Sequence, residues 1–166
     1  MENIDKSEIF ILAVDDNQDN LRVVSSFLKD KGYKIALALN GHDALEILNN
    51  TKIDLVLLDI MMPKMDGFTV CKKIKENPKL VDIPIIFLTA KTETDDIVKG
   101  FEMGGVDYIT KPFKKEELYA RVSSHITIKR TQDYIKKRLK DVSKSRNEVM
   151  KMTLDMAKLL NVRSDG

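Results

Sequence analysis

The residues of this sequence that could do chemistry are polar side chains placed directly after apolar segments. They are Asp15, Asp16, Asp59, Thr89 and Lys111. If the apolar segments are parallel strands, their carboxyl ends meet at one edge, where open α/β sheets bind their ligands. Three carboxylates, a hydroxyl and an amine at that edge suit one task. They can hold a divalent metal and accept a phosphoryl group on a carboxylate.

The three carboxylates bring a metal into the prediction. Neighbouring carboxylates raise one another's pKa, and a divalent cation relieves their repulsion. Mg²⁺ prefers oxygen ligands, keeps several waters and binds through one or two carboxylates together with a phosphate oxygen. We therefore expect Mg²⁺, or Mn²⁺, as the cofactor. Beside it, Lys111 offers an ammonium and Thr89 a hydroxyl to phosphoryl oxygens, and the small Ala90 leaves room for the donor.

Each of these motifs is weak evidence when taken alone. Adjacent acids such as Asp15 and Asp16 are usually a polar turn, and many strands end in an Asp. The Lys111-Pro112 pair alone is a turn with a charge. The combination is specific, because Asp59 follows Asp16 by 43 residues, Thr89 follows by a further 30 and Lys111 by a further 22, each near the end of an expected strand.

The elements that must position these side chains are short apolar runs that alternate with amphipathic stretches. The expected strands cover residues 9–14, 33–39, 53–58, 83–88 and 106–109. The expected helices cover residues 19–31, 42–50, a segment capped by Asp66 and ended before Pro78, 93–103, and a last helix from about residue 114. Alternating strands and helices with near-continuous apolar strands predict an α/β fold, a parallel sheet covered on both faces.

The last helix is expected to continue as a coiled-coil-like tail, because no Gly or Pro occurs from residue 113 to 165. Apolar residues recur every seven positions at Ile135, Val142, Val149 and Met156. The matching d-type positions are Thr131, Arg138, Ser145, Met152 and Leu159, which are polar in the first half. This pattern favours a coiled-coil or signalling helix of moderate quality. The alternative is a partly frayed tail, since an unpaired, highly charged helix is marginally stable in water.

Length and charge divide the chain into an expected domain at 1–126 and an extension at 127–166. The chain has 166 residues, 43% of them apolar, which is enough for one ordinary domain. The extension carries 11 Lys and Arg against 5 Asp and Glu, a net charge of +6 that leaves −4 for the rest. Because acids and apolar residues interrupt its basic residues, a solvated helix face is favoured over a nucleic-acid arm.

Cysteine content and hydropathy place the chain in the cytoplasm. Its one cysteine, Cys71, cannot form an internal disulfide and is expected to be a buried structural thiol. No apolar stretch approaches the roughly 20 residues that span a bilayer, and the N-terminus has no secretory core. We therefore expect a soluble cytoplasmic protein with no membrane partner. His42 and His125 have no partner at ligand spacing and are expected to be solvated.

Several motifs resemble the receiver domain of two-component response regulators. They are Val14-Asp15-Asp16-Asn17, Leu58-Asp59-Ile60-Met61-Met62-Pro63, Met65-Asp66-Gly67, Leu88-Thr89-Ala90 and Asp107-Tyr108-Ile109-Thr110-Lys111-Pro112-Phe113. The resemblance covers residues 10–124. It implies a doubly wound (βα)5 fold, similar to flavodoxin, with a five-stranded parallel sheet in the order 2-1-3-4-5.

The resemblance also implies roles for individual residues. Asp59 is the expected phosphoacceptor, and Lys111 and Thr89 are the residues that assist it. Asp16 and Asp59 are expected to bind the metal directly, the carbonyl of Met61 to add a ligand, and Asp15 to act through water. Tyr108 is expected to be the switch aromatic that moves when Thr89 turns towards the phosphoryl group, and a half-buried strand residue is the alternative. Lys111-Pro112 resembles the family's cis-prolyl junction.

Two functions follow from these expectations. The first is a phosphoprotein switch without enzyme activity, phosphorylated by a sensor histidine kinase or phosphotransfer protein, with output through the C-terminal helix. A homodimer through that helix and a receiver face is the expected assembly. Nucleic acid is not expected as a partner, because no helix-turn-helix pattern follows Ser124.

The second function is the regulatory fragment of a larger enzyme. Residues 152–166 faintly resemble the helix that leads into HD-type cyclic-dinucleotide phosphodiesterase domains, and other output domains are equally compatible. An aspartate-nucleophile phosphatase is disfavoured, because such an enzyme needs an acid two residues after the nucleophile and position 61 is Met.

Overall fold

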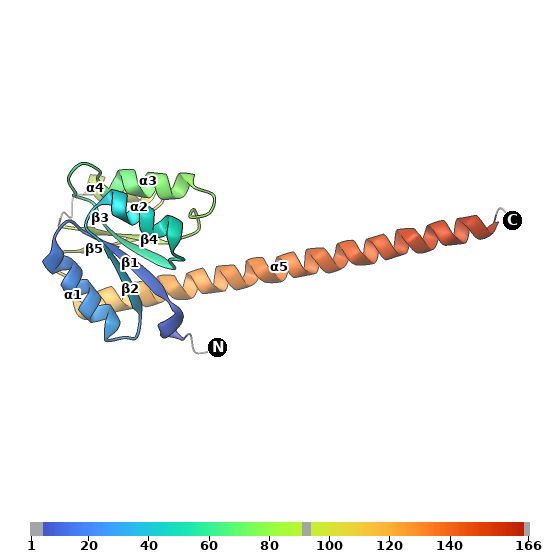
Figure 1. The fold of residues 1–166 in the computed structure, drawn as a ribbon, viewed down its shortest axis with the longest axis horizontal. Coiled ribbons are helices and arrows are strands. Elements are labelled where there is room, and N and C mark those ends of the chain that lie inside the picture. The colour runs from blue at the N-terminus through green and yellow to red at the C-terminus, as the bar shows by residue number, and fades with distance from the viewer. Residues whose placement is uncertain (1–4, 91–93, 165–166) are drawn as a thin grey trace. The chain divides into compact units, whose positions relative to one another are not determined.

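The computed structural model describes residues 5–90 and 94–164, and its centre is one parallel sheet (Figure 1). The strands are β1 (Phe10–Val14), β2 (Lys34–Ala38), β3 (Leu55–Asp59), β4 (Ile85–Thr89) and β5 (Asp107–Thr110). Their order in the sheet is β2-β1-β3-β4-β5, and all neighbouring pairs are parallel. The predicted α/β class and strand order are therefore confirmed.

Helices connect successive strands, as the alternating pattern predicted. They are α1 (Gln18–Lys29), α2 (Gly41–Asn50), α3 (Gly67–Glu76), α4 (Thr94–Glu102) and α5 (Lys115–Ser164), and a 3₁₀ turn at Lys6–Glu8 precedes β1. The side chain of Asp66 accepts a hydrogen bond from the Thr69 amide, as expected of an N-cap. Gly104 has a φ of 100°, a left-handed conformation that suits glycine just after a helix. The predicted first residue of α4, Glu93, lies outside the described residues.

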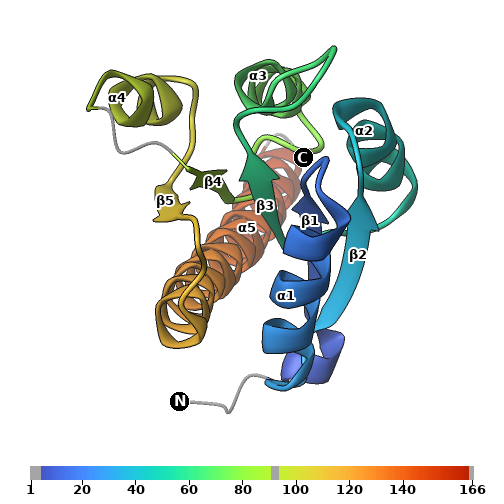
Figure 2. The same ribbon diagram turned by 90° about the vertical axis from the view of Figure 1, so that its left-hand side faces the viewer.

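Helices cover both faces of the sheet, with α1 and the first turns of α5 on one side and α2, α3 and α4 on the other (Figure 2). The first face buries Leu21, Val24 and Leu28 of α1 and Leu118, Val122 and Ile126 of α5. The second buries apolar residues of α2 and α3, among them the predicted structural thiol Cys71, which is fully buried. Because both faces are covered, β3 and β4 are buried at every position, which explains their near-continuous apolar sequences.

The chain separates into two compact units, residues 1–129 and 130–166. The first contains the sheet and the helices packed on it. The described part of the second is helical, and its side chains from residue 131 to 160 are exposed. None of the helices in the described ranges offers a long enough run of apolar residues to cross a membrane.

Candidate functional site

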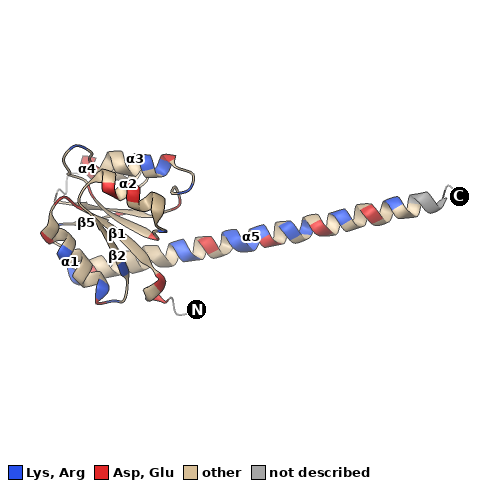
Figure 3. Ribbon diagram, viewed as in Figure 1, with Lys and Arg blue, Asp and Glu red and all other residues tan. Residues whose placement is uncertain are grey.

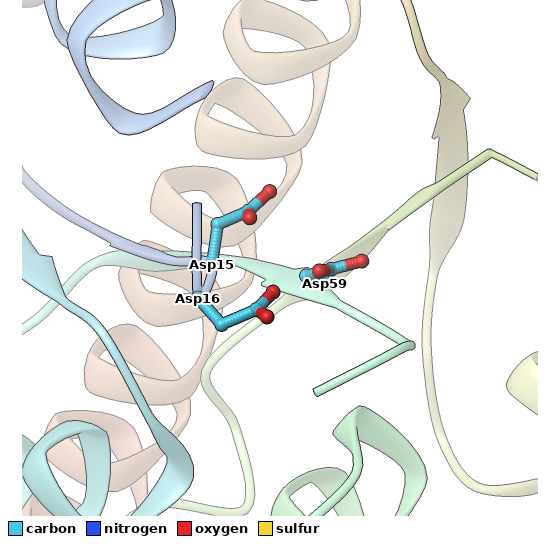
Figure 4. A group of neighbouring side chains, drawn as sticks. All are labelled: Asp15, Asp16 and Asp59. Atoms are coloured by element: carbon cyan, nitrogen blue, oxygen red, sulfur yellow. The ribbon is translucent and has the colours of Figure 1, made fainter. Parts of the chain in front are cut away.

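Three acids come together where β1 and β3 end. Asp59 is the last residue of β3, and Asp15 and Asp16 directly follow β1, the neighbouring strand. Ligand oxygens of the three carboxylates all lie within 4.8 Å of one another (Figure 4). Asp15 and Asp59 are 1% and 3% exposed, and Asp16 is exposed to solvent. The sequence prediction that these acids share one edge of the sheet is confirmed in geometry.

Hydrogen bonds from the first turn of α1 hold Asp15 in place. The backbone amide of Asn17 donates to Oδ1 of Asp15 at 2.9 Å. The side-chain amide of Asn20 donates to Oδ2 at 3.1 Å. Both oxygens of this buried carboxylate therefore accept a hydrogen bond, as buried polar groups require. Sequence reasoning missed Asn20, although its place in the first turn after two acids offered a signal.

Lys111 supplies the positive charge of the site. Its ammonium lies 2.7 Å from Oδ2 of Asp15 and 3.1 Å from Oδ1 of Asp59, and its side chain is 17% exposed. The backbone amide of Lys111 donates to the carbonyl of Thr89, which places β5's end beside β4. The predicted cis peptide bond joins Lys111 to Pro112. Lys111 therefore contacts both buried acids, in addition to its expected role towards a phosphoryl group.

The backbone around Asp59 is closely packed by Gly67. The Gly67 amide donates to the carbonyl of Ile60 at 2.8 Å. A Cβ at position 67 would lie 2.2 Å from the carbonyl oxygen of Asp59, which no side chain could tolerate. The Met61 amide donates to Oδ1 of Asp59 at 3.3 Å, so the backbone after β3 turns around this carboxylate. The close approach of Gly67 gives its place in the predicted motif a physical reason.

The pKa of Asp59 is raised from its ordinary value of 3.8 to about 6. Burial is the largest cause, because it disfavours the charged form. The Lys111 ammonium acts in the opposite direction, while the charge of Asp15 raises the pKa further. Because the pKa of Asp59 lies close to neutral pH, its charge is poorly stabilised, and a bound cation would stabilise it. Groups with pKa values perturbed in this way are concentrated at functional sites.

Thr89 and Tyr108 lie on the strands beside this cluster. Thr89 ends β4 and is 3% exposed, and Ala90, the next residue, is exposed. Tyr108 is half-buried on β5, with its ring edge-on to Phe101 at a centroid distance of 6.4 Å. A small hollow between β4, α4 and β5 is lined by Ile60, Phe87, Thr89, Asp96, Ile97, Gly100, Phe101, Asp107 and Tyr108. The two residues expected to move therefore share one hollow.

The prediction that His125 is a solvated surface residue was wrong. Its Nε2 lies 3.0 Å from Oδ2 of Asp107, and its side chain is 17% exposed. Arg121 donates to both oxygens of Asp107, at 2.9 and 3.0 Å, and its guanidinium lies 5.9 Å from the centre of the Tyr108 ring. These residues are distant along the chain and meet only because α5 packs beside β5. His42 is exposed, as predicted.

The pKa of Asp107 is lowered within this cluster. Burial alone acts to raise it, but the hydrogen bonds from His125, the Tyr108 amide and Arg121 together outweigh burial. The carboxylate of Asp107 therefore remains charged and ties β5 to the first turns of α5.

The family model of the response regulator receiver domain matches residues 11–123. Among curated proteins, a Vibrio cholerae protein named "Probable cyclic di-GMP phosphodiesterase" is 47% identical over 131 residues, which are 79% of this chain and 30% of that protein. The transcriptional regulatory protein DltR of Streptococcus agalactiae is 46% identical over 68% of this chain and 49% of its own length. This chain thus spans less than half of these relatives.

Solved structures of lower sequence identity share the fold. A two-component response regulator from Clostridium difficile superposes with a TM-score of 0.68 at 35% identity, covering 72% of this chain and 97% of that one. The Vibrio cholerae chemotaxis protein CheY4 gives a TM-score of 0.68 at 30% identity, covering 70% of this chain and 97% of its own. The likeness therefore concerns the part of this chain that contains the sheet.

Asp59→Asn should stabilise the metal-free protein at neutral pH. A folded-state pKa above the unfolded value means that protonation of Asp59 stabilises the fold below about pH 4, and that this contribution is lost as the pH rises through about 6. The variant cannot ionise at position 59, so its advantage in unfolding free energy should be about 3 kcal/mol at pH 7.5 and should vanish towards pH 4. Denaturant unfolding in EDTA measures both values.

Asp66→Asn is the matched control, because Asn caps a helix as well as Asp does and Asp66 lies outside the acid cluster. If the free energy of unfolding of Asp59→Asn differed from that of the wild type by the same amount at pH 4 and pH 7.5, the raised pKa of Asp59 would be wrong.

Proposed function

The chain belongs to the response regulator receiver family of two-component systems, and on that premise we propose that Asp59 is its phosphoacceptor. The observation that carries the proposal is the position of this carboxylate, which is buried at the end of β3. It has an ammonium at 3.1 Å and two further acids within 4.8 Å. The proposed phosphoryl donor is the phosphohistidine of a sensor histidine kinase or phosphotransfer protein, which implies a cytoplasmic site of action.

The acid cluster fits a divalent metal, which we propose to be Mg²⁺ or Mn²⁺. Asp16 and Asp59 would hold it directly, the carbonyl of Met61 would add a ligand, and Asp15 would act through water. The fit rests on the donor set, since oxygens of three acids gathered within 4.8 Å are the ligands that such hard cations prefer. When bound, the metal supplies positive charge that offsets the phosphoryl oxygens.

The residues of the chain then have separate tasks. An oxygen of Asp59 forms a bond to phosphorus while the bond from phosphorus to the donor nitrogen breaks, and the electron pair stays on the imidazole. Lys111, already beside Asp59, donates to a phosphoryl oxygen and stabilises its charge. Thr89 donates its hydroxyl to another oxygen, and the exposed Ala90 leaves the approach open.

Phosphorylation is proposed to change the face formed by β4, α4 and β5. The aspartyl phosphate adds about −1.5 to −2 charges and strong acceptor oxygens. When Thr89 turns towards them, it leaves the hollow that it shares with Tyr108. Tyr108 can then move inward from its place against Phe101. This movement is the proposed signal.

The proposed output is the C-terminal helix. We propose a receiver domain at residues 1–126 and a helical extension at 127–166, close to the division of the chain at residues 129 and 130. The apolar residues of the extension from Ile128 to Leu160 that the structure describes include many exposed side chains, and we propose that two chains associate through this helix and through a receiver face. Neither nucleic acid nor a membrane is a proposed partner.

A second candidate is that the chain regulates a larger enzyme. The supporting observation is that the Vibrio cholerae relative named as a cyclic di-GMP phosphodiesterase is 47% identical, while the matched residues make up 30% of that protein. In this case the receiver remains a phosphoacceptor, and catalysis belongs to another domain.

Asp59→Asn should abolish phosphorylation. Incubation of the wild type with Mg²⁺ and acetyl phosphate should add one phosphoryl group, because the donor supplies phosphorus without a kinase, and intact-mass spectrometry detects the adduct. Asp107→Asn is the control, since Asp107 is also partly buried but lies outside the acid cluster. Equal labelling of Asp59→Asn and wild type would overturn the assignment.

Mg²⁺ should raise the melting temperature, and Asp16→Asn should remove most of that rise. A ligand that binds only the folded state stabilises it by a free energy that grows with the logarithm of the ligand concentration once the site is mostly occupied. Asp16 is the exposed member of the cluster. Asp19→Asn, in the first turn of α1 and outside the cluster, should respond like the wild type. If Asp16→Asn keeps the full metal response, Asp16 is not a ligand.

Lys111→Ala and Thr89→Ala should still accept phosphate, more slowly, while losing the switch. Neither residue is the nucleophile, but both are positioned to contact the phosphoryl oxygens. The measurement is the change in NMR chemical shift of β5 amides around Tyr108 upon phosphorylation. Lys114→Ala, an exposed neighbour, serves as control. Wild-type shift changes in the Lys111 and Thr89 variants would argue against this division of tasks.

A further inference from the structure

The described part of α5 beyond residue 129 presents a row of apolar side chains with nothing packed on it. Ile135, Val142, Val149 and Met156 are each at least half exposed. They are spaced by seven residues and so lie along one stripe of the helix, as in the a positions of a coiled coil. Met152 and Leu159, at the d positions, are equally exposed.

The charges beside this stripe are distributed unequally. The g positions, one residue before each a position, are acidic at Asp141, Glu148 and Asp155. The e positions on the other flank are Leu139, Arg146, Thr153 and Leu160, which include no acid. Figure 3 shows acidic and basic residues alternating along this helix. One edge of the stripe is therefore acidic, and the other carries one base and no acid.

This asymmetry distinguishes the two ways in which a second copy could cover the stripe. In an antiparallel pair, g positions face g positions, so the acidic edges of both helices would lie against each other. In a parallel pair, each g position faces the e position five residues later on the partner. Asp141 then faces Arg146, Glu148 faces Thr153 and Asp155 faces Leu160. No like charges meet across these flanks.

We propose that α5 pairs with α5 of a second copy in parallel and in register, with Asp141 of each chain opposite Arg146 of the other. This inference rests on the self-association proposed above. Sliding the helices by one heptad would separate Asp141 from Arg146 and would reduce the number of apolar layers. Arg138 and Ser145 are unfavourable core layers, and polar residues at such positions are known to specify register at a cost in stability.

Asp141→Arg in the full-length chain tests the orientation. In the parallel dimer it places Arg opposite Arg146 twice, so the dissociation constant should rise about tenfold. In an antiparallel dimer it would relieve repulsion between acids, so the dissociation constant would fall. Adding Arg146→Asp should restore wild-type affinity. Sedimentation equilibrium provides the constants, and a fall with Asp141→Arg would overturn the proposal.

Glu148→Arg is the matched control. Asp141 and Glu148 each have a lysine four residues before and another three residues after, namely Lys137, Lys144 and Lys151. Arg138 also lies three residues before Asp141, where Glu148 has Ser145. Charge effects within the helix therefore differ between the two substitutions by one i,i+3 pair, about 0.2–0.5 kcal/mol. Because Glu148 faces Thr153, its substitution should change the dissociation constant by no more than about twofold. Equal weakening by both substitutions would count against the Asp141–Arg146 pair.

Cysteine cross-linking provides a second, independent measurement. In a parallel in-register dimer each a position faces the same position of the second copy. The Ile135→Cys variant and the Met156→Cys variant, each studied by itself, should therefore form an interchain disulfide under oxidising conditions. In an antiparallel dimer a positions face d positions, so neither variant would cross-link with itself although the wild type sediments as a dimer. Asn147→Cys, at an f position, and the wild type, whose Cys71 is fully buried, should remain uncross-linked. If the wild type is a monomer at tens of micromolar and neither variant cross-links, the self-association itself is wrong, rather than its orientation.

Discussion

The contact of Lys111 with two buried carboxylates is the interaction on which the site depends. Asp15 and Asp59 are almost fully buried, and charges removed from water are costly unless they are paired. The ammonium reaches both, at 2.7 and 3.1 Å, yet the pKa of Asp59 remains raised to about 6. Burial therefore still disfavours the charge of Asp59, and a bound cation would offset that cost.

The parallel sheet makes this contact possible. Asp15 and Asp59 follow adjacent strands β1 and β3, and Lys111 follows β5, which lies two strands away from β3 across β4. A long side chain is needed to cover that distance, and the hydrogen bond from the Lys111 amide to the Thr89 carbonyl sets where it begins. Gly67 lets α3 approach the backbone of Asp59 on the other side.

The cluster around Asp107 connects β5, which carries the proposed switch residue Tyr108, to the helix that carries the proposed output. Arg121 and His125 both contact Asp107, the residue before Tyr108, and Arg121 also approaches the Tyr108 ring. A movement of Tyr108 would change the surroundings of Arg121 on α5. The same helix continues to Ser164 and carries the exposed apolar stripe. The contacts of Arg121 and His125 and the proposed pairing with a second copy therefore belong to one continuous helix.

The sequence by itself determined the alternation of strands and helices, the acids at strand ends and the seven-residue repeat of the tail. These follow from local patterns, since the pleat, the helical turn and helix capping depend on neighbouring residues. The strand order came from the resemblance to a family and from no pattern in the strands. Only the tertiary structure decided that Asp59 is buried with a raised pKa, and that Lys111 bridges it to Asp15. It also decided that His125 contacts Asp107 rather than solvent. Such contacts join residues far apart in the chain, and burial depends on what packs around a side chain rather than on what precedes it.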